Sequence, residues 1–510
     1  MLTHFENPVI FMYFCSDKSK TCHSPLFMQR KPSIFLSLLT LVALIGMLAV
    51  AIGVFRDDAL NGGIQLVLLT VAAITSAIGV FYCGVEWKTI EQRIARNFFE
   101  ITPAILILLL IGALAGSWMV SGIIPTLIYY GLHVMHSKFF LVSCCVICCI
   151  VSLMTGSSWT TIATIGVALL GIGQVQGFNP GWVAGAIISG AYFGDKISPL
   201  SDTTVLASTV TDTPLFTHVR YMLYTTVPSI SIALIIYGLA GYSREMPDAS
   251  QIGFFSESLK TSFHITPWLM IVPVATGVMI AKRLPPIVVL FVASLLAGIF
   301  ALCFQPQLLQ EIAGATDGGV ILTCTKGAMM ALFGSTQVET GNEMLNGLVA
   351  TRGMAGMLNT IWLIICAICF GGAMSASGML GSITSLLQRM MKGRISTVAA
   401  TVVSGLTFNV CTADQYIAIV LNGEMFKDIY RKNGFESRLL SRTTEDSVTV
   451  TSVLIPWSSC GMTQATVLGI STLTYLPYCI FNMISPMMSI LVAVTGYKII
   501  RKTTDLTISS

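Results

Sequence analysis

Apolar stretches long enough to cross a lipid bilayer recur along most of this chain of 510 residues. A spanning helix needs about 20 apolar residues, because each residue advances the helix by about 1.5 Å. Hydrophobic residues make up 54% of the chain and charged residues only 10%, whereas soluble domains carry about 25% charged residues. The sequence therefore predicts an all-α polytopic membrane protein. The predicted spans are 33–55, 63–84, 102–130, 180–208, 219–241, 265–281, 284–303, 357–388, 443–469 and 470–497.

Two further apolar segments, 139–173 and 395–426, contain polar interruptions. Basic residues in short loops prefer the cytoplasmic side. All basic clusters can face the cytoplasm only if both segments are re-entrant hairpins, one entering from each side. If both segments cross the membrane instead, the basic loop Lys427–Arg442 falls outside. The hairpin arrangement is therefore the favoured one, and non-helical backbone at that depth is tolerated where it lines a cavity.

The stretch Ser189–Ser208 carries charges inside a long apolar region. Asp195 and Asp202 lie seven residues apart, about two helical turns, with Pro199 between them. Proline removes a backbone donor and frees carbonyl groups near the two acids. Charges within a membrane segment usually mark an ion or substrate path. The alternative is an aqueous loop between two helices.

Three pairs of matching segments indicate an internal duplication. Each pair is related by a similar offset in numbering, so the matches support one another. The pairs are Ser152–Gly171 with Ser404–Gly423, Ser121-Gly122 with Ser377-Gly378, and Ile197–Ser201 with Leu454–Ser458.

Each predicted copy holds about five spans and one re-entrant or broken-helix hairpin, and the odd number of spans inverts the second copy. Inverted repeats with paired broken helices are a transporter architecture, whose substrate binds near the membrane midplane. The predicted organisation is an N-terminal extension 1–32, a first repeat 33–241, a connecting loop 242–264, a second repeat 265–497 and a cytoplasmic tail 498–510.

Oxygen-bearing side chains gather where the predicted helices break. Hydroxyl, amide and carboxylate oxygens suit a hard cation such as sodium, so these positions predict a sodium/proton site. Hydroxyl groups in such segments also serve helix–helix hydrogen bonds, and two of the acids follow a basic loop, which suits an exposed helix start. The candidate residues are Ser157, Asp195, Asp202, Thr203, Asn409, Asp414, Glu445 and Asp446.

The chain resembles the NhaC-type sodium/proton antiporter family, whose relatives include sodium/proton-coupled malate/lactate antiporters. The resemblance covers most of residues 33–497. It implies exchange of sodium for protons in the inner membrane of bacteria and an architecture of inverted repeats with hairpins, and no ligand set is carried over from it. The motifs behind it are GSWMVSGIIPTLIYYGL at 116–132, TGSSWTTIATIG at 155–166, GAYFGDKISPLSDTT at 190–204, FNVCTADQY at 408–416 and SRTTEDSVTVTSVLIPWSSCG at 441–461.

The predicted mechanism is competition, in which a buried carboxylate binds either a proton or sodium while alternating access exposes it to each side. Asp202 and Asp414 are the predicted exchanging pair, with Asp195 as a gate or third carboxylate. Lys196 either pairs with Asp195 or extends to the membrane interface.

Two other functions compete with sodium/proton exchange. Coupled exchange of a small organic anion would use Arg352 or Lys326 to meet a carboxylate, and half-helix N-termini to cradle it. An intramembrane aspartyl protease needs a second facing acid, which the preceding helix does not supply, so the chain is predicted not to be an enzyme. A channel would not need inverted halves.

Several sequence features limit which other ligands and partners are expected. No Lys/Arg patch with interleaved aromatic residues points to nucleic acid, no cofactor is predicted, and the cysteines of CCVICC, Cys144 to Cys149, are read as packing residues. His133 and His136 are candidate pH sensors or interfacial polar residues. Translation is hypothesised to start at Met28, the region 304–356 is expected to form interfacial helices and loops, and the sequence leaves a homodimer open.

Overall fold

The computed structural model of the chain is almost entirely helical. By length and composition, nine helices of the described residues could cross a membrane, or up to 11 if each of two bent pairs counts as one span. The hypothesised start at Met28, His136 and most of the predicted tail lie outside the described part of the chain. The structure describes residues 30–55, 59, 61–135, 137–243, 249–282, 284–314, 319–338, 340, 346 and 349–499.

The first half of the chain folds into two long helical pairs, a broken hairpin, a broken helix and a long closing helix. Its elements are α2 (Ile34–Phe55), α3 (Gly63–Phe81), α4 (Trp87–Val120), α5 (Ile123–Val134), η2 (Ser137–Phe139), α6 (Phe140–Thr155), α7 (Ser158–Thr161), η3 (Ile162–Gly166), α8 (Val167–Val175), α9 (Pro180–Ile197), α10 (Asp202–Val210), α11 (Leu215–Tyr242) and α12 (Ala249–Ser262).

The second half repeats this plan with more interruptions. Its elements are η4 (Pro267–Met270), α13 (Ile271–Ala281), α14 (Pro286–Phe304), α15 (Pro306–Ala313), α16 (Val320–Phe333), η5 (Met354–Met357), α18 (Leu358–Ala376), α19 (Met379–Met390), α20 (Arg394–Thr412), α21 (Gln415–Lys432), α22 (Ser437–Thr444), η6 (Glu445–Thr449), η7 (Ser452–Leu454), α23 (Ser459–Leu468), α24 (Thr472–Tyr475), η8 (Leu476–Tyr478) and α25 (Ile480–Thr495).

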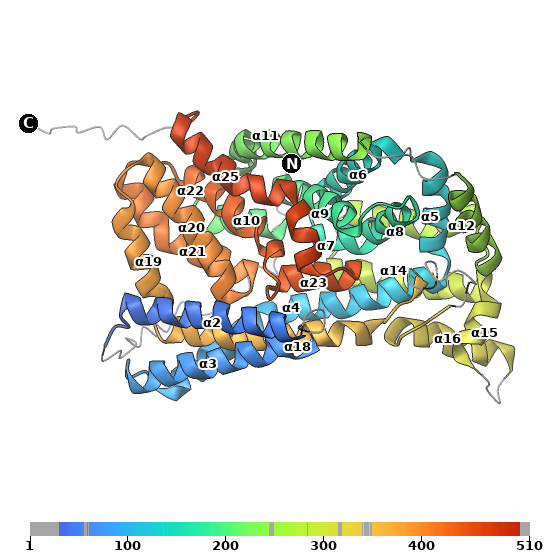
Figure 1. The fold of residues 1–510 in the computed structure, drawn as a ribbon, viewed down its shortest axis with the longest axis horizontal. Helices are drawn as coiled ribbons and strands as arrows, with labels where there is room; N and C mark the ends of the chain where they lie inside the picture. The colour runs from blue at the N-terminus through green and yellow to red at the C-terminus, as the bar shows by residue number, and fades with distance from the viewer. Residues whose placement is uncertain are drawn as a thin grey trace, which may run out of the picture.

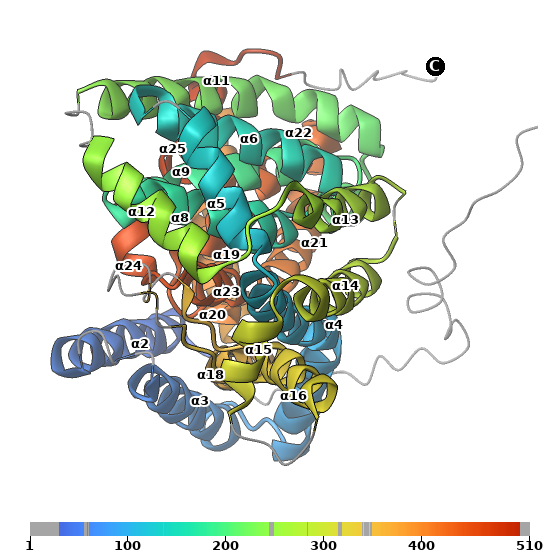
Figure 2. The same cartoon turned by 90° about the vertical axis from the view of Figure 1, so that its right-hand side faces the viewer.

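The helices are arranged in two layers, each with members from both halves. In Figure 1 the lower layer contains α2, α3, α4, α16 and α18, and the upper layer contains α6, α9, α11, α22 and α25. Figure 2 shows α11 and the α2–α3 pair at opposite sides of the molecule. The broken helices lie between these outer elements, so the polar breaks are enclosed by apolar helices.

Element boundaries in the two halves match at a nearly constant offset. The helices α5 and α19 begin and end at the offset that relates Ser121-Gly122 to Ser377-Gly378. Gly122 and Gly378 both adopt a left-handed backbone just before these helices. The offset that relates Ile197–Ser201 to Leu454–Ser458 is larger by one, and it places α9 on the run from α22 to η7 and the start of α11 on the start of α24.

Both interrupted segments form helical hairpins. The rings of Phe140 and Phe178, at the two ends of the first hairpin, stack with centroids 5.1 Å apart. In the second hairpin the hydroxyl groups of Thr401 on α20 and Tyr430 on α21 lie 2.9 Å apart. The arms Ser137–Thr155 and Ser158–Val175 are each long and apolar enough to span a membrane. How deeply the hairpins enter the membrane therefore stays a prediction.

The hairpins correct one register of the sequence comparison. The apex of the first hairpin is Gly156 (φ 67°) and that of the second is Ala413 (φ 54°), both left-handed residues that end a helix. The two apices are separated by as many residues as Ile197–Ser201 and Leu454–Ser458. The separation of Ser152–Gly171 from Ser404–Gly423 is smaller. The predicted overlay of those two segments was therefore wrong by five positions, because coinciding Ser, Thr and Gly letters do not report where the chain turns.

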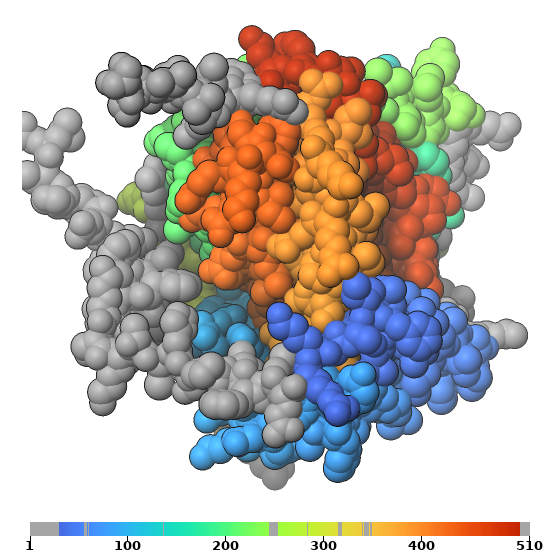
Figure 3. Space-filling model, turned by 90° about the vertical axis from the view of Figure 1, so that its left-hand side faces the viewer, coloured from blue at the N-terminus to red at the C-terminus, as the bar shows by residue number. Residues whose placement is uncertain are grey.

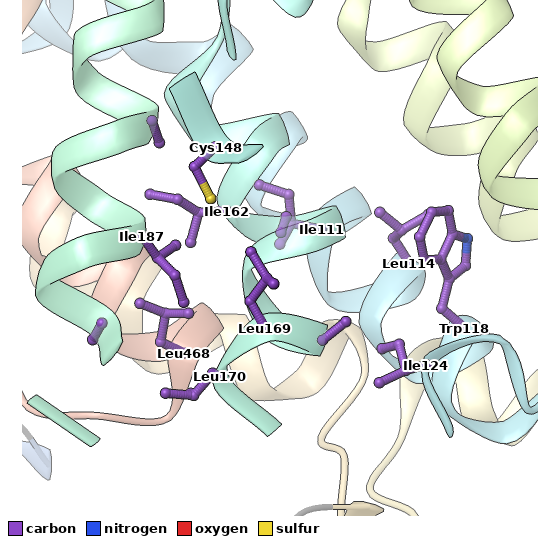
Figure 4. Close-up of a cluster of buried hydrophobic side chains, with 14 of the residues drawn as sticks. Ile111, Leu114, Trp118, Ile124, Cys148, Ile162, Leu169, Leu170, Ile187 and Leu468 are labelled. Carbon is purple, nitrogen blue, oxygen red and sulfur yellow. The ribbon is translucent and has the colours of Figure 1, made fainter. Parts of the chain in front are cut away.

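Small residues bring the first hairpin against α9. A Cβ atom at Gly194 would lie 2.5 Å from the carbonyl oxygen of Cys149, and one at Gly190 would lie 2.2 Å from that of Cys145. The cysteine-rich face of α6 therefore packs directly on glycines of α9. Figure 4 shows Cys148, Ile162 and Ile187 pointing into one apolar cluster around this contact.

The second half contributes to the same interior. Leu468, on α23, lies beside the first-half residues of the cluster in Figure 4. On the opposite side, α2 packs against α19, where the Thr40 hydroxyl oxygen lies 3.7 Å from the Met379 sulfur. Figure 3 shows blue α2 beside the orange helices of the second half. The halves are thus interlocked within the described part of the chain.

One region differs from its expectation. Residues 304–356 were expected to be interfacial helices and loops, but α16 packs in the lower layer. A Cβ atom at Gly116 of α4 would lie 2.0 Å from the carbonyl oxygen of Ala331 on α16. The sequence prediction missed this short apolar helix because the residues on both sides of α16 are mostly polar or glycine.

Candidate functional site

The two breaks of the first half meet side by side. Gly156 ends α6, and the segment Ser198–Ser201 separates α9 from α10. A Cβ atom at Gly156 would lie 2.8 Å from the carbonyl carbon of Leu200, and the Ser198 hydroxyl donates to the Leu153 carbonyl at 2.9 Å. A helix cannot continue normally through Pro199, since proline lacks the backbone donor. Both interruptions therefore stand at the same level.

Asp195 joins these breaks. It lies in the last turn of α9 with only 6% of its surface exposed. One carboxylate oxygen accepts hydrogen bonds from the Ser158 backbone N–H at 3.1 Å and from the Ser158 hydroxyl at 2.6 Å. The partially positive start of the helix that begins at Ser158 favours a carboxylate there. Ser157 acts locally, since its hydroxyl accepts the Thr160 N–H at 3.2 Å.

Asp414 directly follows the apex of the second hairpin. One oxygen of its carboxylate accepts the backbone N–H groups of Tyr416 and Ile417 at 2.9 and 3.1 Å, which caps α21. The other oxygen accepts the hydroxyl of Ser459, the first residue of α23, at 3.0 Å. Asp414 is 1% exposed, so it ties the hairpin apex to the broken helix beside it.

Asp202 and Thr203 begin α10. Asp202 is exposed, and no described residue forms a hydrogen bond or ion pair with its carboxylate. Thr203 is 2% exposed, and its hydroxyl lies 3.0 Å from that of Ser201. Asp202 faces Asp195 within electrostatic reach. Its carboxylate is therefore the least engaged of the predicted acids.

The acids of both halves surround Tyr416. This residue follows the second hairpin apex and lies within electrostatic reach of Asp195, Asp202 and Asp414. The helix α10, which carries Asp202, packs against α21, where a Cβ atom at Gly423 would lie 2.5 Å from Val210. The structure thus brings three predicted carboxylates from two distant chain segments to one region.

A buried ionic network lies next to this region. The Lys196 ammonium donates to the carboxylate of Asp446 and to the hydroxyl of Ser485, the latter at 3.0 Å. The Thr225 hydroxyl donates to the same carboxylate oxygen at 3.1 Å. The Arg442 Nε lies 3.9 Å from the other oxygen, and the side chains of Lys196, Arg442 and Asp446 are fully buried.

This network overturns three sequence expectations. Lys196 pairs with Asp446 rather than with Asp195. Glu445 and Asp446 do not lie at an exposed helix start, because both are fully buried in the π-helical segment η6. Arg442, read as the end of an aqueous basic loop, is also buried. The signal that could have found Arg442 is its spacing of four residues before Asp446, one helical turn.

Glu445 and Asn409 keep unengaged oxygens. Both carboxylate oxygens of Glu445 are buried, and among the described residues only the Thr449 hydroxyl comes near hydrogen-bonding them; Lys196 and Asp195 lie within electrostatic reach. The Asn409 amide donates to the Val448 carbonyl at 2.7 Å, which leaves its own oxygen without a described donor. Free oxygens of this kind are the atoms that a sodium ion would coordinate.

Four of the predicted acids have a serine at the matched position of the other half, whereas Glu445 is matched by Ile188. At the offset that relates the two hairpin apices, carboxylates and hydroxyls alternate between the halves rather than duplicating. The matched positions of the two halves therefore carry different charges. The matched pairs are Asp195 with Ser452, Asp202 with Ser459, Ser157 with Asp414, and Ser189 with Asp446.

A comparison with protein families decides what kind of protein has this site. The model of the Na+/H+ antiporter family matches residues 190–497, which include both broken-helix regions. The chain belongs to this family. It is therefore a multi-pass membrane transporter and not an enzyme, as the apolar helices and the resemblance predicted.

Named relatives of this Na+/H+ antiporter family member transport different cargoes. The Na+/H+ antiporter NhaC of Alkalihalophilus pseudofirmus is 34% identical over 92% of this chain and 97% of its own length. The malate-2H+/Na+-lactate antiporter of Bacillus subtilis is 34% identical over 85% of this chain and 89% of its own length. The arginine/ornithine antiporter ArcD of Halobacterium salinarum is 32% identical over 93% and 94%.

One solved structure is more distant. The Neisseria gonorrhoeae MtrF structure, whose title describes antimetabolite efflux pumps, covers 84% of this chain and 94% of its own at 15% identity and a TM-score of 0.38. A similarity this low does not bear on the site.

Proposed function

We propose that this antiporter exchanges sodium for protons across the inner membrane of a bacterium by alternating access. The observation that carries the proposal is the convergence of Asp195, Asp202 and Asp414 around Tyr416, in a chain that belongs to the Na+/H+ antiporter family. A carboxylate that binds a proton cannot at the same time coordinate sodium, so occupation by one ion releases the other.

The hydrogen bonds suggest different roles for the acids. Asp414 accepts three hydrogen bonds and caps α21, which suits a positioning role beside exchange. Asp195 lies within electrostatic reach of Glu445 from the other half, and no described residue hydrogen-bonds the Asp202 carboxylate. We assign the competing binding of sodium and protons to Asp195, Asp202 and Glu445, and retain Asp414 of the predicted exchanging pair as the residue that orders the apex.

The two halves are proposed to be inverted copies. The Tyr221 hydroxyl of α11 donates to the Lys498 carbonyl beyond α25, whereas the Tyr237 hydroxyl donates to the Tyr478 carbonyl before α25. These contacts mean that α11 and α25, which hold matched places in the halves, run antiparallel. Inversion places both broken helices near the midplane and offers equivalent inward and outward states.

Everted membrane vesicles with a pH-sensitive dye test the proposed exchange. Sodium alone should dissipate a preformed proton gradient, and Asp195→Asn or Asp202→Asn should remove at least nine-tenths of that response while the protein stays in the membrane. Ser452→Ala, at the position of the other half that matches Asp195, is the control and should retain most of the flux. Full flux in Asp195→Asn and Asp202→Asn would remove these acids from the mechanism.

Sodium/proton-coupled exchange of an organic acid is the second candidate, favoured by the 34% identity to the malate-2H+/Na+-lactate antiporter. Arg352 and Lys326, the basic residues first suggested for it, are both exposed, and Lys326 donates to the Ala313 carbonyl at 2.8 Å. Lys196 and Arg442 are the basic groups beside the acids. The vesicle experiment separates the candidates, since a requirement for added malate or lactate would favour this one.

A further inference from the structure

Three contacts between α11 and the α22–η6 segment are made by polar or charged side chains. We name these contacts together the polar seam. His218 Nδ1 contacts the Ser441 hydroxyl at one end, the Arg442 guanidinium lies 4.6 Å above the Tyr221 ring in the middle, and Thr225 donates to Asp446 at the other end. The residues of the polar seam are His218, Tyr221, Thr225, Ser441, Arg442 and Asp446.

The polar seam is buried but poorly satisfied by protein groups. Among the described residues, none accepts from Arg442 Nε, Nη1 or Nη2, and none hydrogen-bonds His218 Nε2 or the second oxygen of Asp446. A buried polar group without a partner costs about 1–3 kcal/mol. A seam built only to hold two helices together would be more stable with apolar side chains. The arrangement instead suits a surface that meets water in another state of the transporter.

One end of the polar seam lies against a cavity. A pocket of about 650 Å³ is lined by residues of α11, α21 and α22 and by the loops that precede α11 and α22. Thr217 and Leu440, which directly precede His218 and Ser441, are among its lining residues. The other end of the polar seam reaches Asp446, which follows Glu445. The polar seam therefore joins the pocket to the proposed ion site.

The other half of the molecule shows what this contact looks like without such a role. The matched contact packs α9 against the segment from α24 to α25. At the positions of Ser441, Arg442 and Asp446 it carries Ala184, Gly185 and Ser189. A Cβ atom at Gly185 would lie 2.3 Å from the Tyr478 carbonyl oxygen. The same helix pairing is thus built there from small residues in close contact.

We propose that the polar seam is the route by which hydrated cations enter and leave the ion site from the pocket side. In this structure the route is closed by the His218–Ser441 contact and by Arg442 lying on Tyr221. Opening parts α11 from α22 and hydrates the polar seam, whereas the matched contact of α9 stays sealed. This route rests on the proposed cation exchange. It is asymmetric, because the entry is formed between α11 and α22 and not between α9 and α25.

Cysteine accessibility tests this route in everted and right-side-out vesicles. The background is a variant in which the 14 native cysteines are replaced and sodium-driven proton flux persists. The reagent is a small, membrane-impermeant, positively charged methanethiosulfonate. Ser441→Cys should react from the pocket side only, with a rate that changes at least about tenfold between sodium and sodium-free choline buffers, since a ligand shifts the populations of open and closed states.

Matched variants give the controls. Thr217→Cys lies in the pocket lining at an exposed position and should react under both conditions, whereas Ala184→Cys, at the matched position of the sealed contact, should react under neither. Thr225→Cys probes the opposite wall of the polar seam and replaces Ser441→Cys if that variant does not reach the membrane. Labelling of neither seam position, with Thr217→Cys labelled, overturns the route, and so does equal labelling of Ser441→Cys and Ala184→Cys.

The proton flux of each unlabelled variant separates this inference from the proposed function. Intact sodium-driven flux together with an unlabelled polar seam rejects the route alone. Absence of a sodium response in the cysteine-containing parent protein rejects the proposed exchange itself, and the route for cations with it.

Discussion

Asp446 is held by two buried cations of different kinds. Lys196 and Thr225 hydrogen-bond one carboxylate oxygen, while Arg442 Nε lies 3.9 Å from the other. A buried charge without a counter-charge is strongly unfavourable, so each member of the group depends on the others. Lys196 comes from the first half and the other two ions come from the second. The network therefore fixes the position of α9 relative to η6.

The unequal number of charges leads to a stability prediction. Asp446→Leu leaves two buried cations unpaired and should lower the free energy of unfolding by about 3–5 kcal/mol. Lys196→Met should cost less, because Arg442 still neutralises Asp446. Thermal unfolding in detergent measures both, with the double variant Lys196→Met/Asp446→Leu completing a thermodynamic cycle. Equal losses in the two single variants would contradict the assigned pairing.

At the scale of the element, each half is organised by a hairpin apex beside a broken helix. Gly156 and Ala413 turn the two hairpins with the same left-handed backbone. The residue after each apex caps the next helix through its side chain: Ser157 with its hydroxyl and Asp414 with its carboxylate. The breaks are therefore defined local structures that present helix ends to the ion site.

The two apices respond oppositely to matched substitutions. Ala413→Gly should stabilise the protein by up to about 1 kcal/mol, because a left-handed conformation costs a residue with a Cβ atom roughly 1–2 kcal/mol and the added freedom of glycine offsets part of the gain. Gly156→Ala should destabilise it, since φ is 67° there and the new Cβ atom would lie 2.8 Å from the Leu200 carbonyl carbon. Melting temperatures in one detergent compare them, and a stabilising Gly156→Ala would refute the apex geometry.

On the scale of the whole molecule, the two halves share one framework and divide the chemistry between them. Matched positions carry a carboxylate in one half and a serine in the other at four places. The polar seam likewise exists on one side only. A pseudo-symmetric framework gives a transporter two comparable states, while the asymmetric charges let the ions take different routes in those states.

Competition for the same carboxylates predicts a pH dependence of transport. As the pH falls, more of the acids carry protons, so sodium must displace a proton and the apparent KM for sodium should rise. At high pH the acids are charged and the apparent KM should reach a constant low value. Flux measured over a series of sodium concentrations at several pH values tests this. An apparent KM that does not change with pH would exclude shared binding.

Features of this fold that depend on neighbouring residues could be predicted from the sequence, whereas those that depend on contacts between distant segments could not. The apolar stretches, the breaks at Gly156 and Pro199 and the presence of two related halves follow from local composition and spacing. The error in matching the hairpins arose because similar Ser, Thr and Gly letters occur on both sides of each turn, and only the backbone shows that Gly156 corresponds to Ala413.

The sequence by itself determined that this chain is a helical membrane protein with acids at chain breaks, since hydrophobic length and proline or glycine breaks act within a few residues. Only the tertiary structure decided which charges meet. Lys196 stands next to Asp195 in the chain yet pairs with Asp446, 250 residues away. The physical reason is that successive side chains on a helix point to different sides. Lys196 and Asp195 therefore face different neighbouring helices, and each neighbour supplies its own partner.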